Sequence, residues 1–357
     1  MRLLQSLYKI QSKSGQEKAI GTFIQTWITN KVPSAITKVD KKGNIYVTKG
    51  VSDTYPVVVA HQDQVQSPAN IDVLLHKDII LGVVEGSPAT AGLGADDKNG
   101  IWIALQCLVK IPKIKIALFV EEEVGCHGSR VADMSFFNDA RFVIQCDRRG
   151  GYDFINTAAG TELCSKEFIE AANISAFGYK LCTGALTDVK TLKENGLKVS
   201  CCNLSCGYYS PHTDHEMTKI SELKNCLAFV LHLCQTLTNV YPHEHKTYSV
   251  YTPASRNVAN QPYYGAGLGS WFQDDIPFDD VDISPRKVRR KIDSKLFNEQ
   301  SDAARTAIRE ELKSGRRLDY PLDFYLENKN LFTMLSYNHI CKIFFAVKNE
   351  IAKTNNR

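Results

Sequence analysis

Histidine and carboxylate side chains recur where apolar runs of this sequence end. His61 follows the apolar run 57–60 directly, and Asp63 comes two residues later. Neutral imidazole is a good zinc ligand, and a nearby carboxylate can orient the ring through its other nitrogen. An HxD pattern alone is a weak signal, because a histidine at the end of a strand is as often a structural hydrogen-bonding group.

Two adjacent aspartates, Asp96 and Asp97, lie between Gly94 and Gly100 at the start of an apolar helical run. Acidic residues at a helix start ordinarily serve as N-caps. One cap does not need two neighbouring acids flanked by glycines. A carboxylate in this position could instead bridge two cations, which would offset the close approach of like charges.

Three consecutive glutamates, Glu121, Glu122 and Glu123, follow the apolar run 116–120. Acidic runs on protein surfaces usually lie in polar surroundings. Here the acids end a predicted core strand, so their mutual repulsion requires cations or protons nearby. The pattern therefore favours a functional site over a solvated loop.

A further acid, Asp147, ends the apolar run 142–146, and two histidines, His212 and His215, precede the helical run 221–237. The simpler interpretations are a salt bridge between Asp147 and a neighbouring arginine, and histidines that face solvent. From the residues alone, either histidine could be a metal ligand.

Taken in order, these segments resemble the co-catalytic two-zinc exopeptidases, that is, peptidase T and the related zinc aminopeptidases. The resemblance covers roughly residues 1–240. It rests on HxD at 61–63, GADDKxG at 94–100, EEVG at 122–125, Asp147 and HTxxE at 212–216.

The resemblance implies a site with two zinc ions, for which cobalt or manganese could substitute. His61 and His212 would each bind one metal, Asp96 would bridge both, and the Asp96–Asp97 peptide is often cis in this family. Glu122 would be the general base, and Asp63 would orient His61. A turn at Thr187–Asp188 resembles a substrate-side loop of the relatives. The implied metal ligands are His61, Asp96, Glu123, Asp147 and His212.

Strand-like and helix-like runs alternate through the first two-thirds of the chain. This order predicts an α/β fold with a mixed, mostly parallel central sheet and helices on both faces, as in the zinc aminopeptidases. Two short helices should open the chain, with Ser14 and Glu17 as a capping box before the second. The predicted strands are 45–47, 57–60, 115–120, 141–146, 152–156, 179–183 and 198–204. The predicted helices are 99–110, 165–176, 189–195 and 221–237.

We expect a catalytic domain over residues 1–250, a loop or linker over 251–285 and a helical C-terminal extension over 286–357. The extension could mediate oligomer formation. Its basic run 286–291 is better explained by a solvated helical face than by a binding partner. Many peptidase T relatives carry a lid domain between the positions of Asp147 and His212. The intervening 64 residues, 148–211, continue the α/β pattern, so we expect no such lid.

Composition excludes some classes of protein. The net charge of +4, from 43 basic and 39 acidic residues, does not indicate a nucleic-acid partner. The 11 scattered cysteines form no CxxC pair and are expected to be buried, reduced thiols. No run approaches about 18 consecutive apolar residues, and the first residues show no long apolar stretch or small-residue cleavage site. We expect a soluble, cytoplasmic protein that acts without a membrane.

The sequence thus predicts a two-metal hydrolase that cleaves short peptides from the N-terminus, as an aminopeptidase or a di- or tripeptidase. Two metals about 3.5–4 Å apart polarise the scissile carbonyl and activate water, and Glu122 transfers the proton. The first alternative is a zinc amidohydrolase of N-acyl amino acids, with Arg148 or Arg149 binding the substrate carboxylate. The others are a non-catalytic binding module on the same scaffold and a nucleic-acid-binding protein that uses the basic extension.

Overall fold

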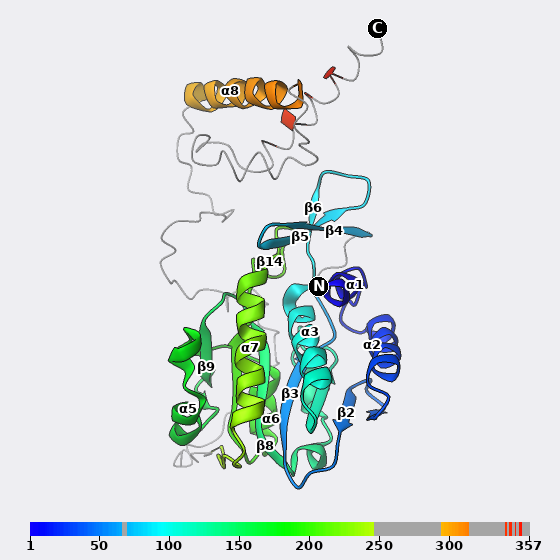
Figure 1. Cartoon of the computed structure of the whole chain (residues 1–357), viewed down its shortest axis with the longest axis vertical. Coiled ribbons are helices and arrows are strands. Elements are labelled where there is room, and N and C mark those ends of the chain that lie inside the picture. Colours follow the sequence, from blue (N-terminus) through cyan, green and yellow to red (C-terminus); the bar gives the residue numbers. More distant parts are fainter. Residues whose placement is uncertain are drawn as a thin grey trace, which may run out of the picture. The chain divides into compact units, whose positions relative to one another are not determined.

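The computed structural model describes residues 1–65, 70–245 and 294–313, and in addition residues 340, 343, 344, 347, 350 and 351 (Figure 1). The chain divides into two compact units, Met1–Thr247 and Tyr248–Arg357. The predicted linker 251–285 and the basic run 286–291 lie outside the described residues. The two predicted boundaries, after residues 250 and 285, therefore stay predictions.

A nine-stranded mixed sheet forms the centre of the first unit, in the order β1-β2-β7-β3-β8-β12-β9-β10, with β11 paired to β9. Its four central strands, β7, β3, β8 and β12, are parallel. Strands β3, β7 and β12 are buried along their whole length, as expected for parallel strands covered on both faces. The strands are β1 (Ala35–Val39), β2 (Ile45–Lys49), β3 (Tyr55–His61), β7 (Ile114–Phe119), β8 (Ala140–Arg148), β9 (Asp153–Ala158), β10 (Thr161–Glu162), β11 (Lys180–Gly184) and β12 (Cys201–Ser205).

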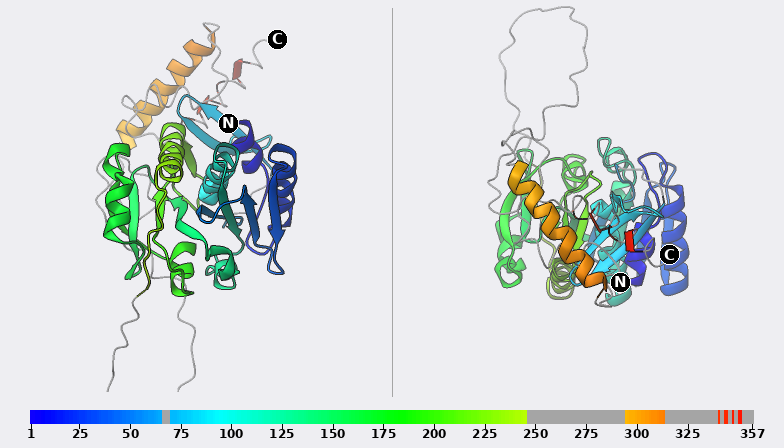
Figure 2. Two further views of the ribbon diagram at one scale, coloured as in Figure 1. Left: turned by 60° about the horizontal axis from the view of Figure 1, so that its bottom comes forward. Right: turned by 90° about the horizontal axis from the view of Figure 1, so that it is seen from above.

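Helices cover both faces of this sheet (Figure 2, left). Alternate residues of β3 point to opposite faces, so Val58 and Ala60 join one apolar cluster while Val57 and Val59 join the other. The first cluster includes residues of α1 (Arg2–Tyr8), α2 (Lys18–Lys31), α3 (Ala95–Lys110), α5 (Lys166–Ala172) and α7 (Ile220–Thr236). The second includes residues of α6 (Asp188–Glu194) and of the short helix η1 (Met134–Phe137). The predicted α/β fold class is confirmed.

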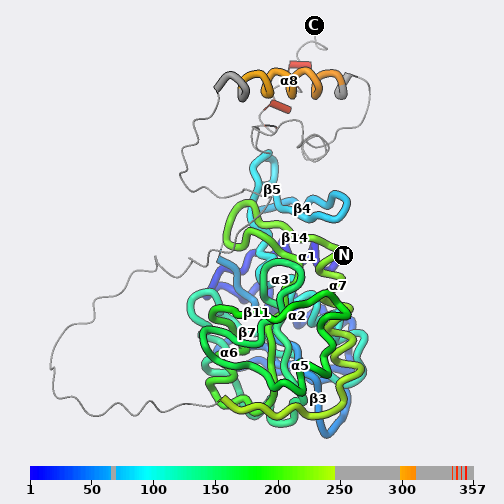
Figure 3. The backbone as a smooth tube through the Cα atoms, turned by 90° about the vertical axis from the view of Figure 1, so that its left-hand side faces the viewer, coloured from blue at the N-terminus to red at the C-terminus, as the bar shows by residue number. Residues whose placement is uncertain are grey.

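A second, smaller sheet was not predicted. It has the order β13-β14-β5-β4, with β6 paired to β5, and Figure 3 shows the β4–β5 hairpin extending from the rest of the unit. The loop 210–216 between β13 and β14 carries both candidate histidines, so this sheet positions part of the candidate site. Its strands are β4 (Ile71–His76), β5 (Ile79–Val84), β6 (Thr90–Ala91), β13 (Tyr208–Tyr209) and β14 (Met217–Lys219).

The predicted capping box is wrong. Helix α2 begins after Glu17, and no side-chain hydrogen bond caps it. The hydroxyl of Ser14 donates instead to Oδ2 of Asp63 at 2.7 Å. Oε1 of Glu17 accepts the backbone N–H groups of Gly15 and Glu121. Both polar residues of the motif therefore contact the segments around the candidate site rather than the helix end.

The short helices α4 (His127–Arg130) and η2 (Ile174–Phe177) complete the first unit. In the second unit, α8 (Ser294–Lys313) buries Ala304 and Ile308 with Ile340 and Phe344, among others. The predicted extension thus contains a helix. The cysteines among residues 1–245 are free thiols, and all are buried except the half-buried Cys182. No helix among the described residues is long and apolar enough to cross a membrane.

Candidate metal centre

The carboxyl ends of three neighbouring parallel strands converge on one edge of the main sheet. His61 ends β3, Glu121–Glu123 follow β7, and Asp147 lies near the end of β8. The start of α3 brings Asp96 and Asp97 to the same place, and the β13–β14 loop brings His212. Such an edge of a parallel sheet is the usual location of a ligand site in α/β proteins.

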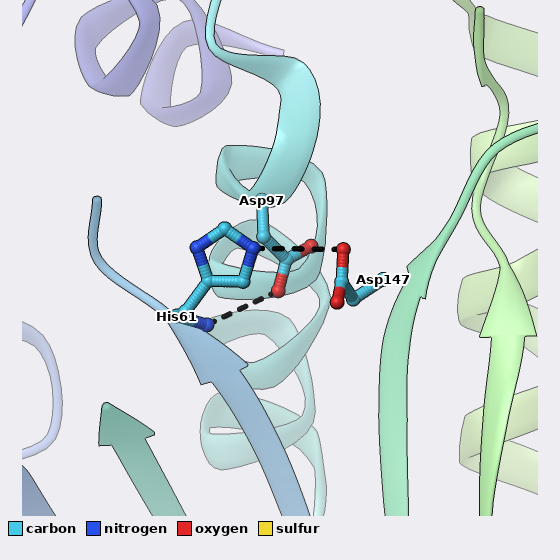
Figure 4. A group of neighbouring side chains, drawn as sticks. All are labelled: His61, Asp97 and Asp147. Carbon is cyan, nitrogen blue, oxygen red and sulfur yellow. Dashed lines mark hydrogen bonds and ion pairs between the residues drawn. The ribbon is translucent and has the colours of Figure 1, made fainter. Parts of the chain in front are cut away.

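His61 is fully buried among carboxylates (Figure 4). Its ring Nε2 lies 3.1 Å from Oδ1 of Asp96 and 3.6 Å from Oδ1 of Asp147. On the other side of the ring, Nδ1 lies 3.3 Å from Oδ1 of Asp63. Nε2 thus faces the two candidate ligands, while Nδ1 faces the residue predicted to orient it.

Asp96 lies between the two halves of the cluster. Its Oδ1 faces His61, whereas its Oδ2 lies 3.3 Å from Nε2 of His212. The same Nε2 lies 2.9 Å from Oε1 of Glu123. The structure therefore joins His61, Asp96 and Asp147 on one side, and His212, Asp96 and Glu123 on the other.

Of the two candidate histidines, only His212 reaches these carboxylates in the described part of the chain. Nδ1 of His215 lies 3.1 Å from the hydroxyl of Thr90 in the smaller sheet. His212 has a φ of +61°, a left-handed backbone conformation that is uncommon outside glycine.

Asp97 also lies in the cluster, although the sequence did not single it out as a ligand. It forms a close group with His61 and Asp147 (Figure 4). Its Oδ2 accepts the backbone N–H of His61 at 3.2 Å, and its Oδ1 accepts that of Gly100 at 3.0 Å. Both oxygens thus hold backbone segments of the site. The Asp96–Asp97 peptide is cis, as the resemblance implied.

Glu122, the predicted base, is held through its backbone. Oδ1 of Asp63 accepts the N–H of Glu122 at 2.9 Å, and Oδ2 accepts the N–H of Glu123 at 3.2 Å. The thiol of Cys126 donates to Oε1 of Glu122 at 3.4 Å. Asp63 therefore connects His61 to both glutamates.

The electrostatics of the cluster follow from burial and close charges. Burial acts to lower the pKa of His61, but Asp147, Asp63 and Asp96 raise it well above the ordinary value. Burial likewise opposes protonation of His212, whose hydrogen bonds to Asp96 and Glu123 raise its pKa to about 11. Burial raises the pKa values of Asp147 and Glu122 well above the usual range.

This donor set fits metal ions. Imidazole nitrogens and carboxylate oxygens are the ligands that zinc and related divalent ions take in proteins. In the described ranges, the ion pairs of Asp63, Asp96, Glu123 and Asp147 are all with histidines. The alternative interpretation, a salt bridge between Asp147 and a neighbouring arginine, is not found there, and Arg148 pairs with Asp153 instead. A cluster of buried acids without lysine or arginine partners is a site for added positive charge.

Sequence reasoning missed several residues that support the site. Glu216 is buried, and its two oxygens accept the N–H groups of Gly94 and Asp96 at 2.6 and 3.1 Å. The only sequence signal was the final position of HTxxE. Buried Lys98 donates to the carbonyl of Ile10 at 2.7 Å and to the side chain of Gln64.

Thr187 and Asp188, predicted as part of a substrate-side loop, are only 2% and 0% exposed. They lie at the start of α6, on the face of the sheet opposite α3 and α7. Both side chains are thus buried within the fold, and the similarity of this turn to a substrate-side loop stays a prediction.

Comparison with known proteins gives matches by structure but not by sequence. No family model matches the chain, and no curated protein matches it. Aminopeptidase PepT from Bacillus cereus aligns with a TM-score of 0.55 and 15% identity, over 66% of this chain and 97% of that one. A tripeptidase from Staphylococcus aureus aligns with a TM-score of 0.53 and 13% identity, over 66% and 96%.

A TET aminopeptidase from a marine sediment archaeon of the Thaumarchaeota also aligns, with a TM-score of 0.53 and 12% identity, over 66% of this chain and 97% of that one. At these identities the alignments show a shared fold. The chain therefore has the fold of the solved aminopeptidases and tripeptidase, as its sequence motifs led us to expect.

Proposed function

We propose that the protein is a two-metal hydrolase that cleaves short peptides from the N-terminus. The observation that carries this proposal is the position of Asp96, whose two carboxylate oxygens face two different histidines. Each histidine has a further carboxylate beside it, Asp147 for His61 and Glu123 for His212. One shared and two separate carboxylates are the donor set of a paired metal centre.

In this proposal His61, Asp96 and Asp147 would hold one ion, and His212, Asp96 and Glu123 would hold the other. The ions would be zinc, cobalt or manganese. Bound there, such a pair polarises a carbonyl and lowers the pKa of water.

The chain's own residues supply the proton transfers and the geometry. Glu122 accepts a proton from the attacking water and returns it to the leaving amine. Asp63 fixes the Nδ1 side of His61, which leaves Nε2 for the metal side. His61, Asp63 and Asp96 are buried, which strengthens the charge interactions among them.

The fold supports a peptidase, because the solved structures that share it include an aminopeptidase PepT and a tripeptidase. Free, buried thiols support a reducing compartment such as the cytoplasm. As part of the proposal, we therefore assign this chain a peptidase activity and a location in the cytoplasm.

A peptide panel tests the function. The full-length protein is assayed with zinc, cobalt or manganese on di- and tripeptides with free or acetylated N-termini, and on N-acetyl amino acids. We expect release of the N-terminal residue from free peptides only. Cleavage of N-acetyl amino acids alone would establish the amidohydrolase instead.

The base is tested by Glu122→Gln, with Glu121→Gln as the matched control. Glu121 lies next in the chain but pairs with Lys42 and His127 outside the cluster. Glu122→Gln should keep its metals and lose roughly 10²- to 10⁴-fold in kcat. Glu121→Gln should stay close to wild type. Hydrolysis by Glu122→Gln at the native rate would refute the assigned base.

A further inference from the structure

Hydrogen bonds from behind the site fix Asp147 at both its backbone and its side chain. Oδ1 of Asn203 accepts the Asp147 N–H at 2.8 Å, and Nδ2 of Asn203 donates to the Asp147 carbonyl at 2.9 Å. Nε2 of Gln145 donates to Oδ2 of the Asp147 carboxylate at 3.0 Å. The hydroxyl of Tyr208 donates to Oδ1 at 3.2 Å. The direction of the carboxylate thus depends on how the Gln145 amide is turned.

The Gln145 amide is held in one orientation. The backbone N–H of Val189 can only donate, and it lies 3.0 Å from the oxygen Oε1 of Gln145. The hydroxyl of Thr187 donates to the same oxygen at 2.5 Å. Nε2 of Gln145 therefore points to Asp147, with Oδ2 of Asp188 at 3.5 Å on its other side.

Thr187 occupies the N-cap position of α6, yet its side chain does not cap the helix. A threonine at an N-cap ordinarily accepts a backbone N–H from the first turn. Here the hydroxyl accepts Nδ2 of Asn203 at 3.2 Å and donates to Gln145. It thus connects the two side chains, one on β8 and one on β12, that hold Asp147.

From this network we infer that Thr187 is a positioning residue, which sets the Asp147 carboxylate through Gln145 and Asn203. The inference rests on the proposed function, because it assigns Thr187 a role in metal binding at Asp147. A buried network with all partners satisfied is rigid. Partners that orient a metal ligand typically change metal affinity by 10- to 100-fold when they are removed.

The variant Thr187→Val removes the hydroxyl and keeps the shape of the side chain. Thr191→Val is the matched control, since Thr191 lies in the same helix, is 3% exposed and makes no hydrogen bond to Gln145, Asn203 or Asp147. Thr187→Ser restores the hydroxyl. Metal-free full-length protein of each variant is titrated with Co²⁺, and visible absorption reports both occupancy and ligand geometry.

We expect Thr187→Val to bind one of its two Co²⁺ ions roughly 10- to 100-fold more weakly, with an altered visible spectrum. Thr191→Val and Thr187→Ser should resemble the wild type. Thermal unfolding of the metal-free proteins shows whether a substitution also lowers the stability of the fold. If Thr187→Val does not fold, Gln145→Met, which removes the donor to Asp147, is judged by the same measurements.

Unchanged Co²⁺ affinity and spectrum in Thr187→Val would overturn the positioning role while leaving the proposed function intact. An equal loss of affinity in Thr191→Val would also overturn it, because the effect would then be one of general packing. A wild-type protein that binds no Co²⁺ would overturn both this inference and the proposed function.

Discussion

Oδ1 of Asp63 accepts the backbone N–H of Glu122 at 2.9 Å. The same carboxylate lies 3.3 Å from Nδ1 of His61, accepts the N–H of Glu123 and is held by the hydroxyl of Ser14. The buried side chain of Asp63 therefore orients His61, a candidate metal ligand at the end of β3, and holds Glu122, the candidate base that follows β7. The sequence predicted only the first of these two roles.

The first prediction concerns Asp63→Asn. The amide would keep one acceptor oxygen but present a donor to the other of the two backbone N–H groups, which needs an acceptor. Metal affinity should fall roughly 10- to 100-fold, because His61 loses its orienting partner. At saturating metal, kcat should still be reduced, because Glu122 is displaced. Metal titration followed by steady-state kinetics checks both effects. A variant whose kcat recovers fully at high metal would show that Asp63 does not set Glu122.

The second prediction compares the two loop histidines. His212→Ala should bind a single metal ion per chain, because Nε2 of His212 is the imidazole beside Asp96 and Glu123. His215→Ala should keep two ions, since Nδ1 of His215 lies beside the hydroxyl of Thr90 in the smaller sheet. Elemental analysis of both purified variants decides the question. Loss of a metal from His215→Ala alone would reverse the assignment.

The third prediction concerns Glu216→Gln. Glu216 uses both oxygens to accept the N–H groups of Gly94 and Asp96. Glutamine offers one acceptor, so the segment that carries Asp96 loosens and metal affinity should fall roughly 10-fold or more. Glu222→Gln is the matched control, because Glu222 is equally buried but bonds to Tyr209 and Lys219. Equal metal affinity in the two variants would show that Glu216 does not support metal binding through the Asp96 segment.

The fourth prediction is a pH dependence of the metal-free protein. Contacts with Asp96 and Glu123 raise the pKa of His212 from 6.5 to about 11. The folded state therefore binds this proton more tightly than the unfolded state does. The resulting stability is fully present below pH 6.5 and is lost as the pH rises toward 11. Urea unfolding across this range should show a smaller decline in His212→Gln than in wild type. Identical slopes would contradict the shift.

The sequence predicted the strand-end residues of the site because their signal is local. An apolar run that ends in an acid or a histidine places that side chain at the edge of a parallel sheet. His61 and Asp147 follow this rule, and the structure brings them within 3.6 Å of each other. The assignment of Asp96 as a ligand depended on the resemblance to the two-zinc exopeptidases, because a pair of acids at a helix start is ordinarily explained as a cap.

The smaller sheet escaped prediction because its strands give weak signals. Strands β6, β13 and β14 are two or three residues long, too short to show a period. Strand β5 contains Gly82, which reads as a strand breaker. Glycine is required at position 82 because a Cβ there would lie 2.6 Å from the carbonyl oxygen of Ala91 on β6.

The supporting hydrogen bonds escaped prediction because they join residues far apart in the chain. Ser14 and Glu17 matched a capping box, yet their partners are Asp63 and the backbone of Glu121. Glu216 is another example, because its carboxylate accepts the N–H groups of Gly94 and Asp96. Local pattern rules cannot show such contacts.

The central claim is that Asp96 joins two metal sites on a single chain. Titration of the metal-free, full-length protein with Zn²⁺ in a calorimeter measures the number of ions directly. The account predicts two ions per wild-type chain, and at most one in Asp96→Ala, which lacks the shared carboxylate. A wild-type chain that binds one ion or none, or an Asp96→Ala variant that still binds two with native affinity, would contradict it.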